Sequence, residues 1–214
     1  AMIDPNPRVA GSGLATLQAA GIQTAAGLLA EQAEALNPGF LSRLRHGRPY
    51  VRLKLAASLD GRTALANGVS QWITGEAARA DVQRLRARSA AIITGIGTVL
   101  ADNPRLTVRE PAAERQPLRV IVDPHLSTPA DAKLLAEPGA TLIVTTNSDG
   151  DDAEPLMAAG AEVLCHDALL GHVDLDALLR HLAEREINEV LVEAGAGLAG
   201  AFVKAGLVDE LVIY

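Results

Sequence analysis

The chain has 214 residues, which is enough for one domain of good size or for one domain with a piece of another. Its formal net charge of −7 argues against a general nucleic-acid-binding protein, although local arginines can still hold a small anion. Cys165 is the only cysteine, so no internal disulfide can form and we expect a cytoplasmic protein. No apolar run reaches the roughly 18 residues of a membrane span, so we expect no membrane partner.

Residues 1–48 precede the main domain, and the sequence predicts only short helices in them. Residues 13–20 predict a short helix, and residues 31–45 predict a second, interrupted helix. The chain does not begin with methionine, and it ends at Tyr214 inside an apparent strand. We therefore expect a piece of a longer protein, with a sheet that lacks its C-terminal strands.

The main domain opens at Pro49 with an alternating stretch. In residues 50–57 apolar and basic side chains alternate, which is the period of a strand. Thr74 predicts the N-cap of a helix over residues 75–87. Arg86 belongs to a polar face of this helix, which either serves a site or is simply solvated.

Residues 89–109 are the stretch around which the chain is organised. The apolar residues 90–93 predict a strand buried on both faces of a parallel sheet, because they do not alternate with polar residues. Gly95 and Gly97 then allow a sharp turn or a close approach to a ligand. A carboxylate, Asp102, and two arginines follow, as in sites at the carboxyl ends of strands in open α/β sheets. The alternative is a strand, a tight turn and a solvated polar loop.

Strands and helices alternate through the rest of the chain. Short apolar runs predict strands at residues 118–122, 141–145, 162–164, 189–192 and 210–214. Asp174 predicts the N-cap of an amphipathic helix. The buried stripe of that helix consists of Leu175, Leu178, Leu179 and Leu182. This succession indicates an α/β fold with a mostly parallel central sheet flanked by helices.

The segment Gly195–Gly200 matches the pattern G-x-G-x-x-G between a strand and a helix. In that position backbone N–H groups and the helix dipole face an anion, so the segment predicts a nucleotide-phosphate loop. The alternative is close packing of a helix rich in glycine and alanine. No acid stands where the ordinary dinucleotide fingerprint needs one, which indicates a different fold. The five histidines lack metal-ligand spacing, and we expect no metal site.

Four motifs resemble those of a known family. They are LKLAASLDGRTA (53–64), SQWITG (70–75), TVLADNPRLTVR (98–109) and VEAGAGLAGAF (192–202). In this order they are similar to the reductase domain of the bifunctional riboflavin-biosynthesis deaminase–reductase, over residues 49–214. Residues 1–48 resemble the end of that family's deaminase domain with its linker. The zinc-deaminase signature is absent from the sequence, so we expect no deaminase activity from this chain.

The resemblance implies a dihydrofolate-reductase-like three-layer fold and an NADPH-dependent oxidoreductase of riboflavin biosynthesis. It would reduce 5-amino-6-(5-phosphoribosylamino)uracil to 5-amino-6-(5-phosphoribitylamino)uracil. The expected partners are this phosphoribosylaminopyrimidine substrate and a second copy of the chain in a homodimer. Two other functions stay open: a pterin or folate reductase of the same fold, and a non-catalytic nucleotide-binding fragment.

The resemblance also implies where the ligands bind. Cofactor contacts are implied for Ala56, Trp72, Thr98, Asp102, Gly195, Ala196, Gly197, Leu198, Ala199 and Gly200. Substrate contacts are implied for Ser70, Arg86, Leu106, Arg109 and Glu193. The two arginines would hold the ribose phosphate, because guanidinium groups suit phosphate oxygens, and Glu193 would accept from the pyrimidine amino groups. Lys54 and Asp102 match positions tied to the reductive step, and which of them handles the proton stays open.

Overall fold

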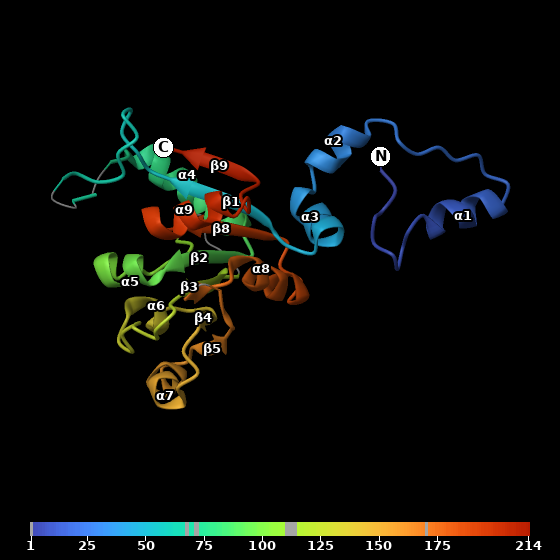
Figure 1. Ribbon diagram of the computed structural model, residues 1–214. Helices are drawn as coiled ribbons and strands as arrows, with labels where there is room; N and C mark the ends of the chain where they lie inside the picture. The colour runs from blue at the N-terminus through green and yellow to red at the C-terminus, as the bar shows by residue number, and fades with distance from the viewer. Residues whose placement is uncertain (1, 67–68, 71–72, 110–114, 170) are drawn as a thin grey trace.

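Within residues 2–66, 69–70, 73–109, 115–169 and 171–214, which this computed structural model describes, seven parallel strands form one central sheet (Figure 1). The strands are β1 (Tyr50–Leu55), β2 (Ala91–Gly95), β3 (Leu118–Val122), β4 (Thr141–Thr145), β5 (Glu162–Cys165), β8 (Glu189–Glu193) and β9 (Glu210–Ile213). Their order across the sheet is β5-β4-β3-β2-β8-β1-β9, and every neighbouring pair is parallel. Two shorter strands, β6 (Ala168–Leu169) and β7 (His172–Val173), form a separate antiparallel hairpin.

Helices cover both faces of the sheet. They are α1 (Ser12–Ala19), α2 (Ala30–Ala35), α3 (Pro38–His46), α4 (Glu76–Arg88), α5 (Ile96–Asp102), α6 (Lys133–Ala136), α7 (Gly150–Ala158), α8 (Leu175–Glu184) and α9 (Ala196–Lys204). On one face α8 and α9 pack through Leu178 and Phe202 onto residues such as Leu53. On the other face α5, α6 and α7 surround Ile121 and Ile143. The sheet and its two helical layers confirm the predicted three-layer α/β fold.

The amphipathic pattern of α8 is confirmed. The Asp174 carboxylate accepts hydrogen bonds from the backbone N–H groups of Asp176 at 2.9 Å and Ala177 at 3.1 Å, so it caps the helix as predicted. All four leucines of the predicted stripe are buried. Strand β1 also alternates as predicted, because Val51 and Leu53 enter the core shared with α8 and α9. The intervening basic side chains therefore point to the opposite face.

The N-terminal residues reach the sheet through one short helix. Helix α3 packs against β1, and its Arg43 Nε donates to Asn188 Oδ1 at 2.6 Å, just before β8. Gly39 permits this contact, because a Cβ there would lie 2.7 Å from the Asn188 carbonyl oxygen. Helix α1 lies well away from the sheet (Figure 1). None of the helices in the described part of the chain has the length and apolar character that crossing a bilayer requires.

The predicted cap of α4 was wrong. The helix begins after Gly75, which has an extended backbone and no side chain to cap it. The Thr74 carbonyl instead accepts a hydrogen bond from Arg79 Nη1 at 2.8 Å. Gly75 and not Thr74 therefore occupies the N-cap position, so the Thr74 hydroxyl stands one residue before the position from which a side chain caps a helix.

The segment after β2 forms a helix that the sequence did not predict. Helix α5 follows Gly95 directly, because Val99 packs into the second core cluster and is 2% exposed. It ends at Asn103, which adopts a left-handed φ of 41° before Pro104. Helices α6 and α7 and the β6–β7 hairpin were also not predicted. Asp102 therefore ends a helix that starts at the carboxyl end of β2.

Candidate active site

The sheet has a topological switch point between β2 and β8. From β2 the chain passes through α5 to β3, towards one edge of the sheet. From β8 it passes through α9 to β9, towards the other edge. Because the two connections diverge, a crevice opens at the carboxyl ends of these strands, which is where open α/β sheets bind ligands. A cavity of about 1280 Å³ lies there.

This cavity brings together most of the residues that the sequence implied. The implied residues that line it are Lys54, Ala56, Ser70, Arg86, Thr98, Asp102, Leu106, Arg109, Glu193, Gly195, Ala196, Gly197 and Leu198. Trp72 lies outside the described residues. Ala199 and Gly200, although described, do not line the cavity. Ala199 is 4% exposed and packs into the core, because it sits on the sheet-facing side of α9.

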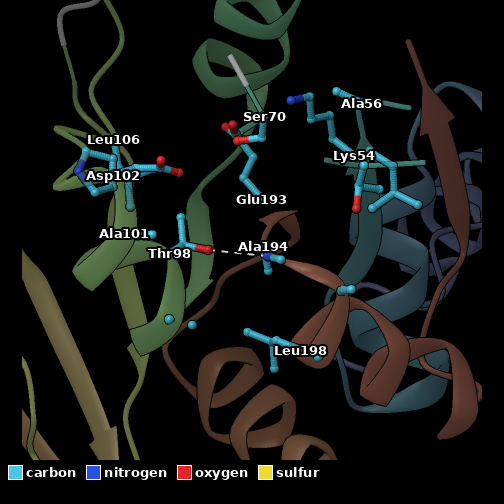
Figure 2. Close-up of a pocket in the computed structure, with 18 of the residues that line it drawn as sticks. Lys54, Ala56, Ser70, Thr98, Ala101, Asp102, Leu106, Glu193, Ala194 and Leu198 are labelled. Carbon is cyan, nitrogen blue, oxygen red and sulfur yellow. Dashed lines mark hydrogen bonds between the residues drawn. The ribbon is translucent and has the colours of Figure 1, made fainter. Parts of the chain in front are cut away.

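One wall of the cavity is the beginning of α9. Gly195 is the N-cap, and its backbone N–H donates to Thr98 Oγ1 across the crevice at 3.3 Å (Figure 2). The first N–H groups of a helix have no partner within the helix and carry its positive dipole end. Gly95 lets this wall approach β2, since a Cβ there would lie 3.3 Å from Leu198 Cδ2. The wall therefore presents backbone donors at the cavity, and the binding of a nucleotide phosphate to them stays a prediction.

The opposite wall holds an ion pair between two implied substrate ligands. Arg86 Nε and Nη2 donate to the two oxygens of Glu193 at 2.6 and 3.0 Å, and Arg86 Nη1 donates to the Thr107 carbonyl at 3.1 Å. The two side chains are only 13% and 11% exposed. Burial disfavours the Arg86 charge, but attraction to and hydrogen bonding with Glu193 outweigh it and raise the pKa of the guanidinium. Arg86 and Glu193 thus form a bidentate ion pair. Their spacing in the sequence did not indicate this pair.

Three charged groups of the cavity lack such a partner. Within the described ranges, the side chains of Lys54, Asp102 and Arg109 make no hydrogen bond or ion pair with another residue. Lys54 lies beside Glu193 in the β1–β8 register. Figure 2 shows Lys54 and Asp102 extending into the cavity from opposite sides, with Glu193 between them. These groups are therefore available to a ligand.

Several lining residues were missed by sequence reasoning. Pro124 and His172 line the cavity but belong to none of the motifs, and Thr63 lies within the first motif without having been singled out. Pro124 follows the carboxyl end of β3 closely, so the end of that predicted strand was a usable signal. His172 comes from the two-residue strand β7, which is too short to show a periodicity in the sequence. Among the described residues, no cluster of three or more potential metal ligands occurs.

Comparison with known sequences finds a matching family and a relative that cover most or all of the chain. The model of the RibD C-terminal domain matches residues 49–214. The riboflavin biosynthesis protein RibD of Escherichia coli is 46% identical over 225 residues, which cover 100% of this chain and 60% of that protein. The chain therefore spans about three fifths of the length of that curated relative.

Solved structures give the same result. The structure of Acinetobacter baumannii RibD has a TM-score of 0.85 and 44% identity, over 98% of this chain and 58% of that one. A Thermotoga maritima structure is described as a diaminohydroxyphosphoribosylaminopyrimidine deaminase/5-amino-6-(5-phosphoribosylamino)uracil reductase. It has a TM-score of 0.80 and 31% identity, over 97% of this chain and 56% of that one. The dihydrofolate-reductase-like fold implied by the resemblance is confirmed.

Proposed function

The chain belongs to the RibD C-terminal domain family, and on that premise we propose that it reduces 5-amino-6-(5-phosphoribosylamino)uracil with NADPH. The product would be 5-amino-6-(5-phosphoribitylamino)uracil, an intermediate of riboflavin biosynthesis. The observation that carries the proposal is one cavity with two chemically different walls. Its volume of about 1280 Å³ exceeds the roughly 300–1,000 Å³ of a pocket for one small ligand, which suits a cofactor beside a substrate.

NADPH fits the wall formed by α9. The exposed N–H groups after Gly195 suit the cofactor pyrophosphate, and Thr98 lies within reach of the same groups. Ala56 and Asp102 also line the cavity, and the nicotinamide ring would lie near them, beside the substrate. When bound, the cofactor supplies the hydride, and the chain's own residues bind, orient and supply a proton.

The substrate fits the wall that carries Arg109 and Glu193. The Arg109 side chain has no partner among the described residues, so it is available to the ribose phosphate, with Ser70 and Leu106 nearby in the cavity lining. The Glu193 carboxylate is held by Arg86 and would accept from the pyrimidine amino groups.

Reduction adds a hydride to ribose C1 and a proton to the ring oxygen that leaves C1, which opens the sugar. We assign delivery of that proton to Lys54 or Asp102, the two positions that the family resemblance ties to the reductive step. Neither side chain makes a hydrogen bond or ion pair with a described residue, so both are available. The two side chains approach from opposite sides of Glu193 (Figure 2).

Product analysis tests the proposal. The chain is incubated with NADPH and the phosphoribosylaminopyrimidine, and the product is identified by mass spectrometry. We expect a product heavier by two hydrogens and one NADPH oxidised per product formed. Dihydrofolate serves as the alternative substrate and should remain unreduced. Reduction of dihydrofolate but not of the pyrimidine would replace this proposal with a folate-type reductase.

A further inference from the structure

Residues 103–109, here called the cavity arm, run along the cavity outside the sheet. Two residues of this arm that are not glycine have left-handed backbones, Asn103 with φ 41° and Leu106 with φ 52°. Leu106 is 3% exposed and lines the cavity. Such conformations are unfavourable for side chains with a Cβ and persist only where the surroundings hold them. The arm therefore needs contacts that fix its path.

Gln116 provides the most complete of these contacts. Its side-chain Oε1 accepts a hydrogen bond from the Val108 N–H at 2.8 Å, and its Nε2 donates to the Val108 carbonyl at 3.0 Å. One amide thus satisfies both backbone groups of Val108, as a neighbouring strand would. The flanking backbone is held from α4, where Gln83 Oε1 accepts from the Arg109 N–H at 3.0 Å and Arg86 donates to the Thr107 carbonyl.

The loop at Gly139 packs against Gln116 and restricts its position. Gly139 has a φ of 102°, and a Cβ at that residue would lie 2.9 Å from the Cβ of Gln116. The Gly139 carbonyl accepts a hydrogen bond of 2.6 Å from Arg119 Nη2, and the Arg119 side chain is fully buried. The stem of Gln116 is therefore packed between a rigid loop and the cavity arm. Gln116 does not line the cavity, so direct contact with a ligand in it is not its role.

We propose that Gln116 is a positioning residue that aims Arg109 and Leu106 at the phosphate end of the substrate. The inference rests on the proposed function, because it assumes that Arg109 holds the ribose phosphate. Without Gln116, Val108 would lose both of its backbone hydrogen bonds, and of the bonds described here only those of Thr107 and Arg109 to α4 would remain. The backbone next to Arg109 would then be less restrained, so the guanidinium would be positioned less well for the phosphate. Gln116 forms its described side-chain hydrogen bonds with Val108 and does not line the cavity, so the α9 wall should keep its affinity for the cofactor.

Two substitutions test this role. Gln116→Glu is nearly isosteric and keeps the acceptor for the Val108 N–H, but it sets a carboxylate oxygen against the Val108 carbonyl. Gln116→Met keeps the length and removes both hydrogen bonds without adding charge. Gln32→Glu, on the exposed face of α2, adds the same charge far from the cavity and is the matched control.

Steady-state kinetics give the first measurement. We expect both Gln116 variants to raise KM for the phosphorylated substrate by roughly tenfold or more, with kcat changed much less. KM for the dephosphorylated substrate and the Kd of NADPH should stay within about twofold of the unmutated values, which a general loss of structure would not allow. Gln32→Glu should leave all three unchanged. An unchanged KM for the phosphorylated substrate, or a parallel loss of NADPH affinity, would overturn the inference.

Calorimetric titration with ribose 5-phosphate separates this inference from the proposed function. The titration reads anion binding without any reaction, so it remains informative if the unmutated chain does not turn over the pyrimidine. We expect both Gln116 variants to bind ribose 5-phosphate roughly tenfold more weakly than the unmutated chain. Equal affinities, or no binding by the unmutated chain, would contradict a positioning role for Gln116 even if the reductase activity is present.

Discussion

At the scale of single residues, a substitution of Asp102 separates a catalytic role from a structural role most clearly. Its side chain is exposed to the cavity and makes no hydrogen bond with a described residue, so it is not an acceptor that holds a turn together. Asp102→Asn keeps the shape but cannot supply a proton. We expect turnover to fall by roughly 10²-fold or more with an unchanged melting temperature. Near-normal turnover would leave Lys54 as the remaining candidate for the proton.

Arg109 is a second residue whose role can be isolated. Its guanidinium makes no hydrogen bond or ion pair with a described residue, so its removal should weaken binding and leave stability nearly unchanged. Arg109→Ala should weaken the phosphorylated substrate by about 1.5–3 kcal/mol, the scale of a charged hydrogen bond. The dephosphorylated substrate and NADPH should bind as before. A comparable loss of NADPH affinity in a binding titration would place Arg109 in the cofactor subsite instead.

The sequence motifs identified many of the residues that line the cavity, but they did not reveal the ion pair between Arg86 and Glu193. Gly195 and Asp102 could be placed because each follows a predicted strand, and carboxyl ends of parallel strands meet at one edge. Arg86 and Glu193 are 107 residues apart, and their mutual hydrogen bonds depend on how α4 lies over β8. One sequence without an alignment contains no signal for such a contact.

At the scale of elements, the Arg86–Glu193 pair ties α4 to the end of β8. Arg86→Ala would leave the Glu193 carboxylate largely buried without its partner, a change that typically costs about 3–5 kcal/mol. We expect the melting temperature to fall by on the order of 10 °C, together with a loss of substrate binding. Arg84→Ala is the control on the same helix, because Arg84 forms an exposed pair with Asp81. Equal melting temperatures for the two variants would contradict this account of the pair.

A second tie joins α4 to the end of β9. The Tyr214 hydroxyl donates a hydrogen bond to the Asp81 carboxylate, and burial together with this bond raises the pKa of Tyr214 to about 12. An unfolded tyrosine ionises near pH 10, so the neutral phenol's stabilisation is fully present below about pH 10 and is lost as the pH rises towards 12. The difference in melting temperature between the unmutated chain and Tyr214→Phe should therefore shrink over that range. A constant difference from pH 8 to pH 11 would contradict the raised pKa of Tyr214 in the folded chain.

Elements were predicted where one pattern dominates the local sequence. The seven strands of the sheet appear within one or two residues of the predicted ranges. Strand β1 was found from its alternation, and the central strands from short apolar runs, which suit strands covered on both faces. Helix α5 was missed because it is short and begins with Gly95-Ile96-Gly97, which reads as a turn. It forms nonetheless because Val99 gains a place in the core, a tertiary contact that local propensity does not contain.

At the scale of the whole molecule, the cavity's charges bear on cofactor choice. No acid is placed to bind a ribose 2′-hydroxyl in the usual way, and of the two carboxylates among the described lining residues, Glu193 is already paired with Arg86. A 2′-phosphate therefore meets little repulsion in the cavity. We expect NADPH to bind at least roughly tenfold more tightly than NADH, as measured by fluorescence titration. Equal affinities would contradict this.

The central claim is that one cavity at the β2–β8 switch point carries out the reduction. Gly97 lines that cavity with open space beside it, so Gly97→Leu should fill the site while favouring helix α5. Gly150 also has open space beside it but starts α7, away from the cavity, so Gly150→Leu is the matched control. The measurement is NADPH oxidation at 340 nm with the phosphoribosylaminopyrimidine, beside a melting curve for each chain. The account predicts that Gly97→Leu folds and loses turnover by roughly 10²-fold, while Gly150→Leu matches the unmutated chain. A folded Gly97→Leu variant with full turnover would contradict it.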